Sequence, residues 1–356
     1  MIALTKKNPF ELNKNEKNKI LLEIMTELNQ YHLMNCKTYS NICEGNFANQ
    51  RDKDDLCQLP FVAARIFKLL EMHSLGTEIP TKILNSSSTT SQIPAKIFLD
   101  NLTSKNQTIV LTRIVGNFIG KKRLPMLIID SEETLKKSGV YSARAAGIIG
   151  FSSFANDRCF VLNSDLSINE EKLNGFMEKY GNSEYVIFGF TFVFWKYFIL
   201  ELRKRENRID LSNGVLIHGG GWKKLENNLQ VNKEVFKNIL KDNFNLRRTH
   251  DYYGMVEQVG SIFFECEEGY FHSSIYSDIF IRDPFTFEVL NFGNPGILQC
   301  LSVVPVSYPG HNILTEDEAV IVGEDDCKCQ RLGKYFLVLG RLPKAELRGC
   351  SDTFQV

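Results

Sequence analysis

The sequence predicts an α/β fold in which helices cover a sheet, followed by a small β-rich subdomain. Two patterns indicate this. From about residue 81, short apolar runs alternate with longer amphipathic stretches, as strands alternate with helices in α/β proteins. After about Gly260 the helical pattern fades, and short strand-like runs separated by glycine and proline remain. With 356 residues, 43% of them apolar, the chain can bury a sizeable core.

The elements can be assigned in chain order. A first helix is indicated by apolar residues at helical spacing between Ile20 and Tyr31, and Pro60 is expected to open a second apolar helix. Strands are then expected at Ile93–Leu99, Met126–Ile129, Cys159–Leu162, Tyr185–Phe190 and Val215–Ile217, with helices at Asn169–Tyr180 and Asn232–Phe244. Later strands are expected at Ile262–Phe264, Ile297–Val304, Ala319–Val322 and Tyr335–Leu339.

These patterns suggest four parts. Residues 1–80 form a helical segment packed on the main domain, 81–260 an α/β core, 261–340 the β-rich subdomain, and 341–356 a hinge-like tail. The most apolar stretch, Val186–Leu200, is too short for a membrane span and contains Lys196.

Composition excludes several classes of protein. Acidic and basic residues number 42 each, so a nucleic acid is not the expected main partner. The polar, charged N-terminus lacks a secretory signal, and the nine cysteines are scattered, so we expect a cytoplasmic protein with reduced thiols.

A loop of small hydroxylated residues, Ser86–Gln92, lies between two short apolar strands. Its N–H groups and hydroxyls could hold phosphates, although it lacks the spacing of a Walker loop. Taken alone, the segment is more typical of a flexible polar surface loop.

A glycine-rich turn, His218–Lys224, follows the strand at Val215–Ile217. Its glycines permit close approach of backbone to a ligand, and Trp222 offers a flat apolar surface. The alternative is a tight turn with a half-buried tryptophan.

The segment Asp251–Glu257 combines a tyrosine that could stack on a base with a carboxylate that could bind Mg²⁺. Taken alone, it is more typical of a loop that leads into a helix.

The last motif, Gly340–Cys350, carries Arg341, which could reach a phosphate or ribose, and Cys350, whose thiol lies beside Arg348 in sequence. An ordinary C-terminal thiol is the alternative. The pair Cys327-x-Cys329 is weak evidence for zinc, because no second pair of ligands lies close to it in sequence.

Together and in this order, the four motifs resemble the adenylate-forming superfamily, and specifically its acyl-protein synthetase (luciferin-component ligase) family. The resemblance runs from about Leu59 to Thr353 and includes Tyr308–His311 and Thr315–Glu318. It implies the N-terminal-type domain of these enzymes. Because the sequence stops near the hinge motif, we expect the mobile C-terminal domain to be absent.

The resemblance also implies a reaction with ATP and Mg²⁺, in which a carboxylic acid, expected to be an acyl chain, becomes an acyl-adenylate. A thiol of the protein, or of a partner such as an acyl-reductase, then accepts the acyl group. The matching positions are Ser87, Ser88, Thr89, Thr90 and Ser91 for the phosphates; Gly219, Gly220, Gly221, Trp222, Tyr253 and Gly254 for adenine and acyl group; Asp317 for the ribose; Arg341 at the hinge; Glu257 for Mg²⁺; and Cys350 as a possible acylated thiol.

Two departures leave alternatives open. Ser88 and Ser91 replace glycines of the usual phosphate loop, and Val256 replaces a threonine or serine. A catalytically degenerate scaffold that serves an acyl-reductase is therefore the second hypothesis. An acyl-CoA ligase with a separate C-terminal subunit is the third.

Overall fold

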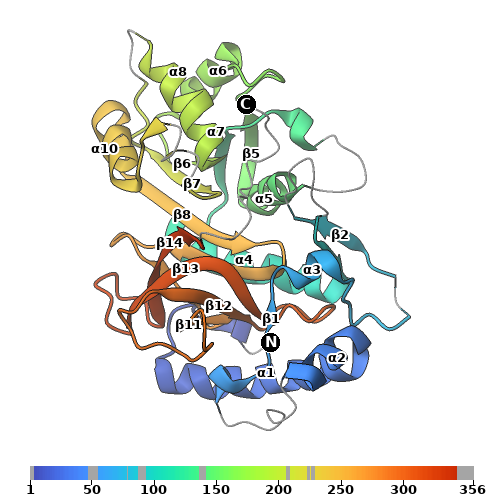
Figure 1. Cartoon of the computed structure of the whole chain (residues 1–356). Coiled ribbons are helices and arrows are strands. Elements are labelled where there is room, and N and C mark those ends of the chain that lie inside the picture. Colours follow the sequence, from blue (N-terminus) through green and yellow to red (C-terminus); the bar gives the residue numbers. More distant parts are fainter. Residues whose placement is uncertain are drawn as a thin grey trace. The chain divides into compact units, whose positions relative to one another are not determined.

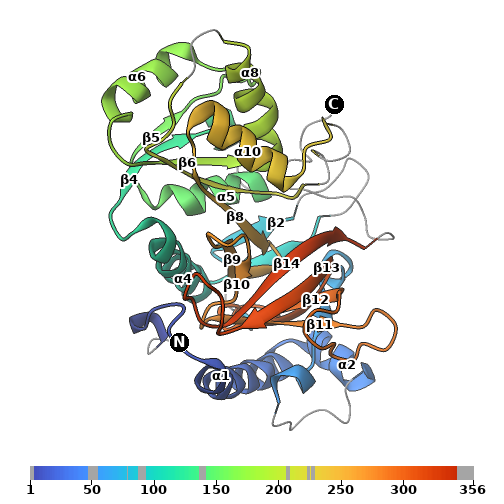
Figure 2. The same ribbon diagram turned by 90° about the vertical axis from the view of Figure 1, so that its left-hand side faces the viewer.

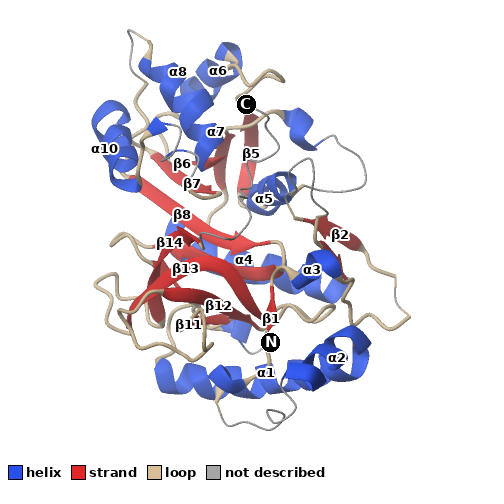
Figure 3. Cartoon of the chain, in the orientation of Figure 1, coloured by secondary structure: helices blue, strands red, loops and turns tan. Residues whose placement is uncertain are grey.

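A computed structural model describes residues 4–46, 55–77, 79–86, 94–135, 142–205, 209–222, 225 and 229–342. The chain forms two compact units (Figure 1). Unit 1 comprises Met1–Phe118 with Gly254–Leu347, and unit 2 comprises Ile119–Tyr253 with Arg348–Val356. Helices and strands occur in both units, which confirms the predicted α/β class (Figure 3). The four-part division expected from the sequence remains a prediction.

Unit 2 contains a parallel sheet with the strand order β8-β7-β6-β4-β5. Every residue of β6 and β7 is buried. Continuous apolar strands of this kind are expected where both faces of a parallel sheet are covered. Figure 2 shows α5 on one face and α6 and α8 on the other. The strands are β4 (Leu124–Ile128), β5 (Ala155–Phe160), β6 (Tyr185–Phe190), β7 (Gly214–Gly219) and β8 (Arg248–Met255).

The longest helices of unit 2 begin at residues whose side chains cap them. The Asn232 side chain accepts a hydrogen bond from the N–H of Val235 at the start of α10, and Asn245 ends that helix in the left-handed conformation. The predicted helices at residues 169–180 and 232–244 are confirmed. The helical elements are η3 (Glu132–Leu135), α5 (Ala143–Ser152), α6 (Glu170–Tyr180), α7 (Thr191–Val193), the π-helix η4 (Phe194–Ile199), α8 (Leu200–Arg203) and α10 (Lys233–Phe244).

Unit 1 contains a largely antiparallel sheet with the order β11-β12-β13-β14-β10-β9, and a separate β2–β3 hairpin. Its strands are β1 (Val62–Ala63), β2 (Lys82–Asn85), β3 (Lys96–Leu99), β9 (Gln258–Glu265), β10 (Phe271–His272), β11 (Ser277–Arg282), β12 (Gly296–Ser302), β13 (Asn312–Glu324) and β14 (Lys334–Arg341). Its helices are η1 (Leu4–Lys6), α1 (Lys14–Asn35), α2 (Lys37–Asn46), η2 (Leu56–Gln58), α3 (Ile66–Leu69) and α4 (Asn101–Ile119).

The prediction of a helix that begins at Pro60 is wrong for the first half of that segment. Residues Val62 and Ala63 form β1, which pairs in parallel with β13, and only Ile66–Leu69 is helical. Pairing with a strand some 250 residues later in the chain overrides the local apolar pattern.

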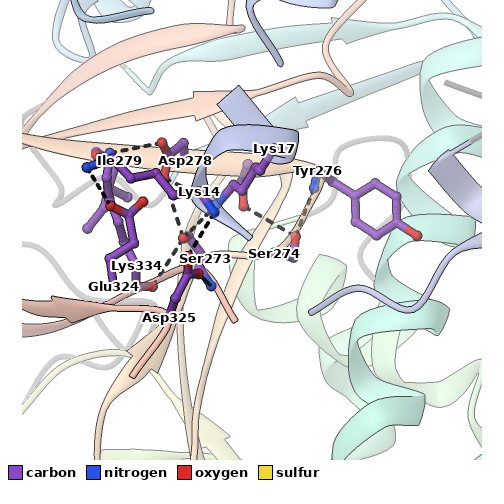
Figure 4. Close-up of polar contacts among 12 residues, drawn as sticks. Lys14, Lys17, Ser273, Ser274, Tyr276, Asp278, Ile279, Glu324, Asp325 and Lys334 are labelled. Atoms are coloured by element: carbon purple, nitrogen blue, oxygen red, sulfur yellow. Dashed lines mark hydrogen bonds and ion pairs between the residues drawn. The ribbon is translucent and has the colours of Figure 1, made fainter. Parts of the chain in front are cut away.

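A buried charge cluster ties α1 to the sheet of unit 1 (Figure 4). Asp278 on β11 accepts from the Nζ atoms of Lys17 (3.3 Å) and Lys334 (2.9 Å), and Lys17 also donates to Ser273 (2.9 Å). All three charged side chains are nearly inaccessible to solvent. Burial is the largest influence on Lys17 and lowers the pKa of its ammonium group, while the Asp278 carboxylate opposes that shift.

Among the described helices, none combines the length and the apolar character that crossing a membrane would require.

Candidate functional site

Glu257 lies in the turn that connects β8 to β9, within unit 1. The segment Asp251–Glu257 is therefore not a loop that leads into a helix. Tyr253 and Gly254 are part of strand β8, which extends from Arg248 to Met255. The side chain of Glu257 is buried, which is unusual for a carboxylate in a turn.

The residues that follow this turn fix its position. Gln258 Nε2 donates to the carbonyl oxygens of Cys300 (2.8 Å) and Gly310 (3.0 Å), and the N–H of Val259 donates to the Tyr308 hydroxyl (2.9 Å). At Gly310 a Cβ atom would lie 2.8 Å from the backbone oxygen of the turn and closer still to the Tyr308 ring. Only glycine fits there, so the turn is held in one place.

Charged residues on two strands act on the Glu257 carboxyl. Burial raises its pKa to about 7, Arg341 acts in the opposite direction, and Glu316 and Asp317 add to the increase. Asp317 on β13 and Arg341 on β14 are cross-strand partners, with 3.5 Å between Oδ1 and Nε. The structure thus brings three of the predicted site residues, Glu257, Asp317 and Arg341, into one electrostatic cluster.

The glycine turn of unit 2 follows β7, as predicted. Gly220 and Gly221 have φ angles of 107° and 79°, a region that favours glycine. A Cβ atom on Gly219 would lie 2.6 Å from the Tyr252 ring on the neighbouring strand. Trp222 Nε1 donates to the Asp251 carboxylate (2.9 Å), which fixes the end of the turn against β8.

Strand alternation places the predicted tyrosine on the same face as Trp222. The Tyr252 ring contacts Phe151 of α5 at 4.9 Å, so it faces that helix. Tyr253 follows it and therefore lies on the opposite face, together with Asp251, to which Trp222 is bonded. Tyr253 thus shares one face of β8 with Asp251, the residue that holds Trp222.

Two of the predicted groups lie outside the described residues: the hydroxylated loop positions Ser87–Ser91 and the thiol of Cys350. The base of that loop is described. It joins the antiparallel strands β2 and β3, and it is closed by hydrogen bonds between Ser86 and Ala95 of 3.0 and 2.9 Å.

The structure also shows positioning residues that the sequence did not reveal. Gln258 and Tyr308 hold the Glu257 turn, and Asp251 holds the glycine turn. His218 lies beside Asp251 and contacts the Thr191 hydroxyl at 3.0 Å. Burial keeps the pKa of His218 well below its ordinary value, so the ring is neutral. Of these, only the side-chain types were visible in the sequence, and their partners are distant in the chain.

The chain is similar to a known protein family and to several solved structures. The sequence profile of the family described as acyl-protein synthetase, LuxE, matches residues 3–356. No curated protein sequence matches the chain.

Solved structures of a 2-hydroxyisobutyryl-CoA ligase share the fold. An open conformation, in complex with 2-HIB-AMP and CoA, has a TM-score of 0.69 at 11% identity and covers 95% of this chain and 77% of that one. The same ligase in the thioesterification state has a TM-score of 0.70 at 13% identity, and the match covers 94% of this chain and 70% of that one. The chain therefore has the fold of the N-terminal domain of adenylate-forming ligases.

Proposed function

Because the chain belongs to the acyl-protein synthetase family, we propose that it uses ATP to activate a carboxylic acid as an acyl-adenylate. The observation that carries the proposal is the cluster of Glu257, Asp317 and Arg341 in unit 1. Its three side chains come from a turn and two strands. The turn is fixed by buried hydrogen bonds, as a binding site requires.

Each member of the cluster has a role that its chemistry suits. The Asp317 carboxylate would accept hydrogen bonds from ribose hydroxyls, and the Arg341 guanidinium would donate to ribose or phosphate oxygens. In unit 2, the glycine turn and Tyr253 would line the adenine and acyl positions.

Glu257 fits the Mg²⁺ ion that accompanies ATP. Its buried carboxyl has a raised pKa, so the charged form lacks full compensation from the protein. A divalent cation held through one carboxylate and substrate phosphates is the usual arrangement for Mg²⁺ in ATP-dependent enzymes. When bound, the ion would neutralise charge on the phosphates.

In the proposed reaction an oxygen of the substrate carboxylate attacks the α-phosphorus of ATP. The bond from that phosphorus to the bridging oxygen breaks, and pyrophosphate leaves. Donors fixed before the reaction, such as the Arg341 guanidinium, stabilise the negative charge that develops. The substrate acid is proposed to carry an acyl chain, as the family name implies.

Acid-dependent exchange of pyrophosphate into ATP tests adenylation. We expect exchange with one class among short, long and aromatic acids, and a loss of at least about 100-fold in Glu257→Gln, the size of effect seen when one stabilising group is removed. The matched control is Glu318→Gln, which changes a half-buried glutamate on β13 and should keep exchange. If no acid supports exchange although ATP binds, the proposal is wrong.

We propose further that the acyl group passes from the adenylate to a protein thiol, with Cys350 as the candidate. The thiolate attacks the carbonyl carbon, the bond to AMP breaks, and a thioester forms. Mass spectrometry of the protein after incubation with ATP and acid should show an acyl adduct that Cys350→Ser abolishes and Cys159→Ser retains. An adduct that persists in Cys350→Ser would reassign the acceptor, and AMP release that requires CoA would indicate an acyl-CoA ligase.

A non-catalytic scaffold for an acyl-reductase is the second candidate, favoured by Ser88 and Ser91 in place of the usual glycines. Restoring both glycines separates the two proposals. Exchange that appears only in the Ser88→Gly/Ser91→Gly protein would make the natural chain a binding module.

A further inference from the structure

Four potential metal ligands converge in unit 1, away from the residues assigned to ATP. They are Cys266, His272, Cys327 and Cys329, and their sulfur and imidazole nitrogen atoms all lie within 4.8 Å of one another. The two halves of the group are distant in sequence, since Cys266 and Cys327 are 61 positions apart. The sequence showed only the Cys327-x-Cys329 half.

The spacing of these atoms fits a tetrahedral ion. Cys266 Sγ lies 4.0 Å from Cys327 Sγ, and Cys329 Sγ lies 3.3 Å from His272 Nε2. Zinc bonds of about 2.3 Å to sulfur and about 2.0 Å to nitrogen, at tetrahedral angles, separate two sulfurs by about 3.8 Å and sulfur from nitrogen by about 3.5 Å. The ligand atoms therefore already stand close to the positions that zinc requires.

Two turns present the ligands. The turn after β9 is closed by a bond of 2.9 Å from the Gly269 N–H to the Cys266 carbonyl, and it returns the chain to His272 on β10. The loop between β13 and β14 contains a second turn, closed by a bond of 2.9 Å from the Gln330 N–H to the Cys327 carbonyl. Strand β10 pairs with both β9 and β14, which brings the two turns together.

The surroundings orient and protect the group. Cys266, His272 and Cys327 are buried, and Cys329 is half-buried. The His272 ring is stacked on Tyr335, with centroids 5.6 Å apart, and contacts the edge of Phe10. These contacts hold the ring in place, and orientation of a ligating histidine is what a metal site needs.

A charged pair lies next to the group in sequence. The Arg331 guanidinium, two positions after Cys329, donates to the Glu267 carboxylate (2.7 Å) and to Asn117 Oδ1 (2.9 Å). A cation close to a cysteine favours the thiolate, the form of sulfur that binds metals.

We propose that Cys266, His272, Cys327 and Cys329 bind one structural Zn²⁺ ion. Three sulfurs and one imidazole in tetrahedral arrangement are typical of structural zinc, and four protein ligands leave no open position for catalysis. A disulfide is a poorer explanation of the group, because the Cys266 and Cys327 sulfurs are about twice the bonded separation apart. The ion would link the β9–β10 turn to the β13–β14 loop.

Metal analysis of the purified full chain, prepared without added zinc and with any affinity tag removed, tests the proposal. We expect about one zinc per chain, as for a site with four ligands. Cys327→Ser/Cys329→Ser should lose it, whereas Cys159→Ser, which changes a half-buried thiol of unit 2, should retain it. His272→Cys should also retain zinc, because it creates a four-cysteine site.

A second measurement does not depend on the variants being folded. Wild-type protein refolded with Co²⁺ should show visible d–d absorption together with thiolate-to-cobalt charge transfer. Zinc well below one equivalent and no such spectrum would overturn the proposal, as would an intact Cys266–Cys327 disulfide in the native protein. Metal content is measured without ATP or an acid, so failure of adenylation leaves this test unaffected.

Discussion

Replacing Glu257 with glutamine should stabilise the folded protein at alkaline pH while it abolishes adenylation. Burial raises the pKa of this carboxyl from 4.5 to about 7. Between those two values the folded protein holds a proton that the unfolded chain has released. The free energy of unfolding therefore falls as the pH rises through this window, and it stays lower above it.

The size of the effect follows from the shift. A pKa that rises from 4.5 to about 7 on folding lowers the free energy of unfolding by about 3 kcal/mol at pH 8 and by about 1 kcal/mol at pH 5.5. Glutamine carries no charge at either pH, so the variant escapes this penalty. The difference in stability between Glu257→Gln and wild type should consequently grow by about 2 kcal/mol between pH 5.5 and 8.

Urea denaturation of both proteins at the two pH values measures this difference. All other titratable groups are the same in both proteins, so their contributions to the pH dependence cancel. Glu318→Gln, the matched control on β13, should show no comparable change. An equal pH dependence of wild type and Glu257→Gln would refute the argument that burial raises the pKa of Glu257. Such a trade of stability for activity is expected at a functional carboxylate.

Three further predictions concern the scaffold. Asp278→Asn leaves two buried lysines without their shared carboxylate and should lower the free energy of unfolding by about 3–5 kcal/mol in urea titrations. The control Glu71→Gln, which breaks an exposed ion pair, should change it by less than about 1 kcal/mol. Gly219→Ala should reduce stabilisation by ATP in thermal melts because its Cβ would strike the neighbouring tyrosine, while Gly175→Ala, exposed on α6, should raise stability by about 0.5–1 kcal/mol. Burial lowers the pKa of His32 from 6.5 to about 4. The free energy of unfolding should therefore fall by about 3 kcal/mol as the pH drops from 6.5 to 4. Urea titrations of His32→Gln should show a smaller decrease over the same pH range.

The sequence predicted those elements whose signal is local. Strand β6 coincides with the predicted Tyr185–Phe190, because a continuous apolar run bounded by polar residues has few other solutions. Helix α10 was predicted from its spacing, and Asn232 and Asn245 explain its ends. These parts of the fold depend on neighbours in the chain.

The features that the sequence did not reveal depend on partners far away in the chain. The residues after Pro60 read as helical, yet Val62 and Ala63 pair with β13. The order of motifs predicts a role for Glu257, but no local pattern reveals that its turn is held by Gln258, or that its carboxyl is buried. Likewise, Cys327-x-Cys329 looked incomplete because the other two residues of the group, Cys266 just after β9 and His272 on β10, lie far earlier in the chain.

The β13–β14 hairpin carries residues of both proposed sites, and the separation of these residues predicts what loss of zinc should do. The cysteines lie in its loop, whereas Asp317 and Arg341 pair near its open end. From Asp317 to the end of β13 at Glu324 is seven residues, or about 23 Å of strand. An ion in the loop is too distant to contact a nucleotide bound at the open end. Chelation should therefore lower the melting temperature and leave the KM for ATP unchanged in the protein that stays folded. If the KM for ATP rises on zinc loss while the folded fraction stays constant, the bound ion instead helps to position Asp317 and Arg341.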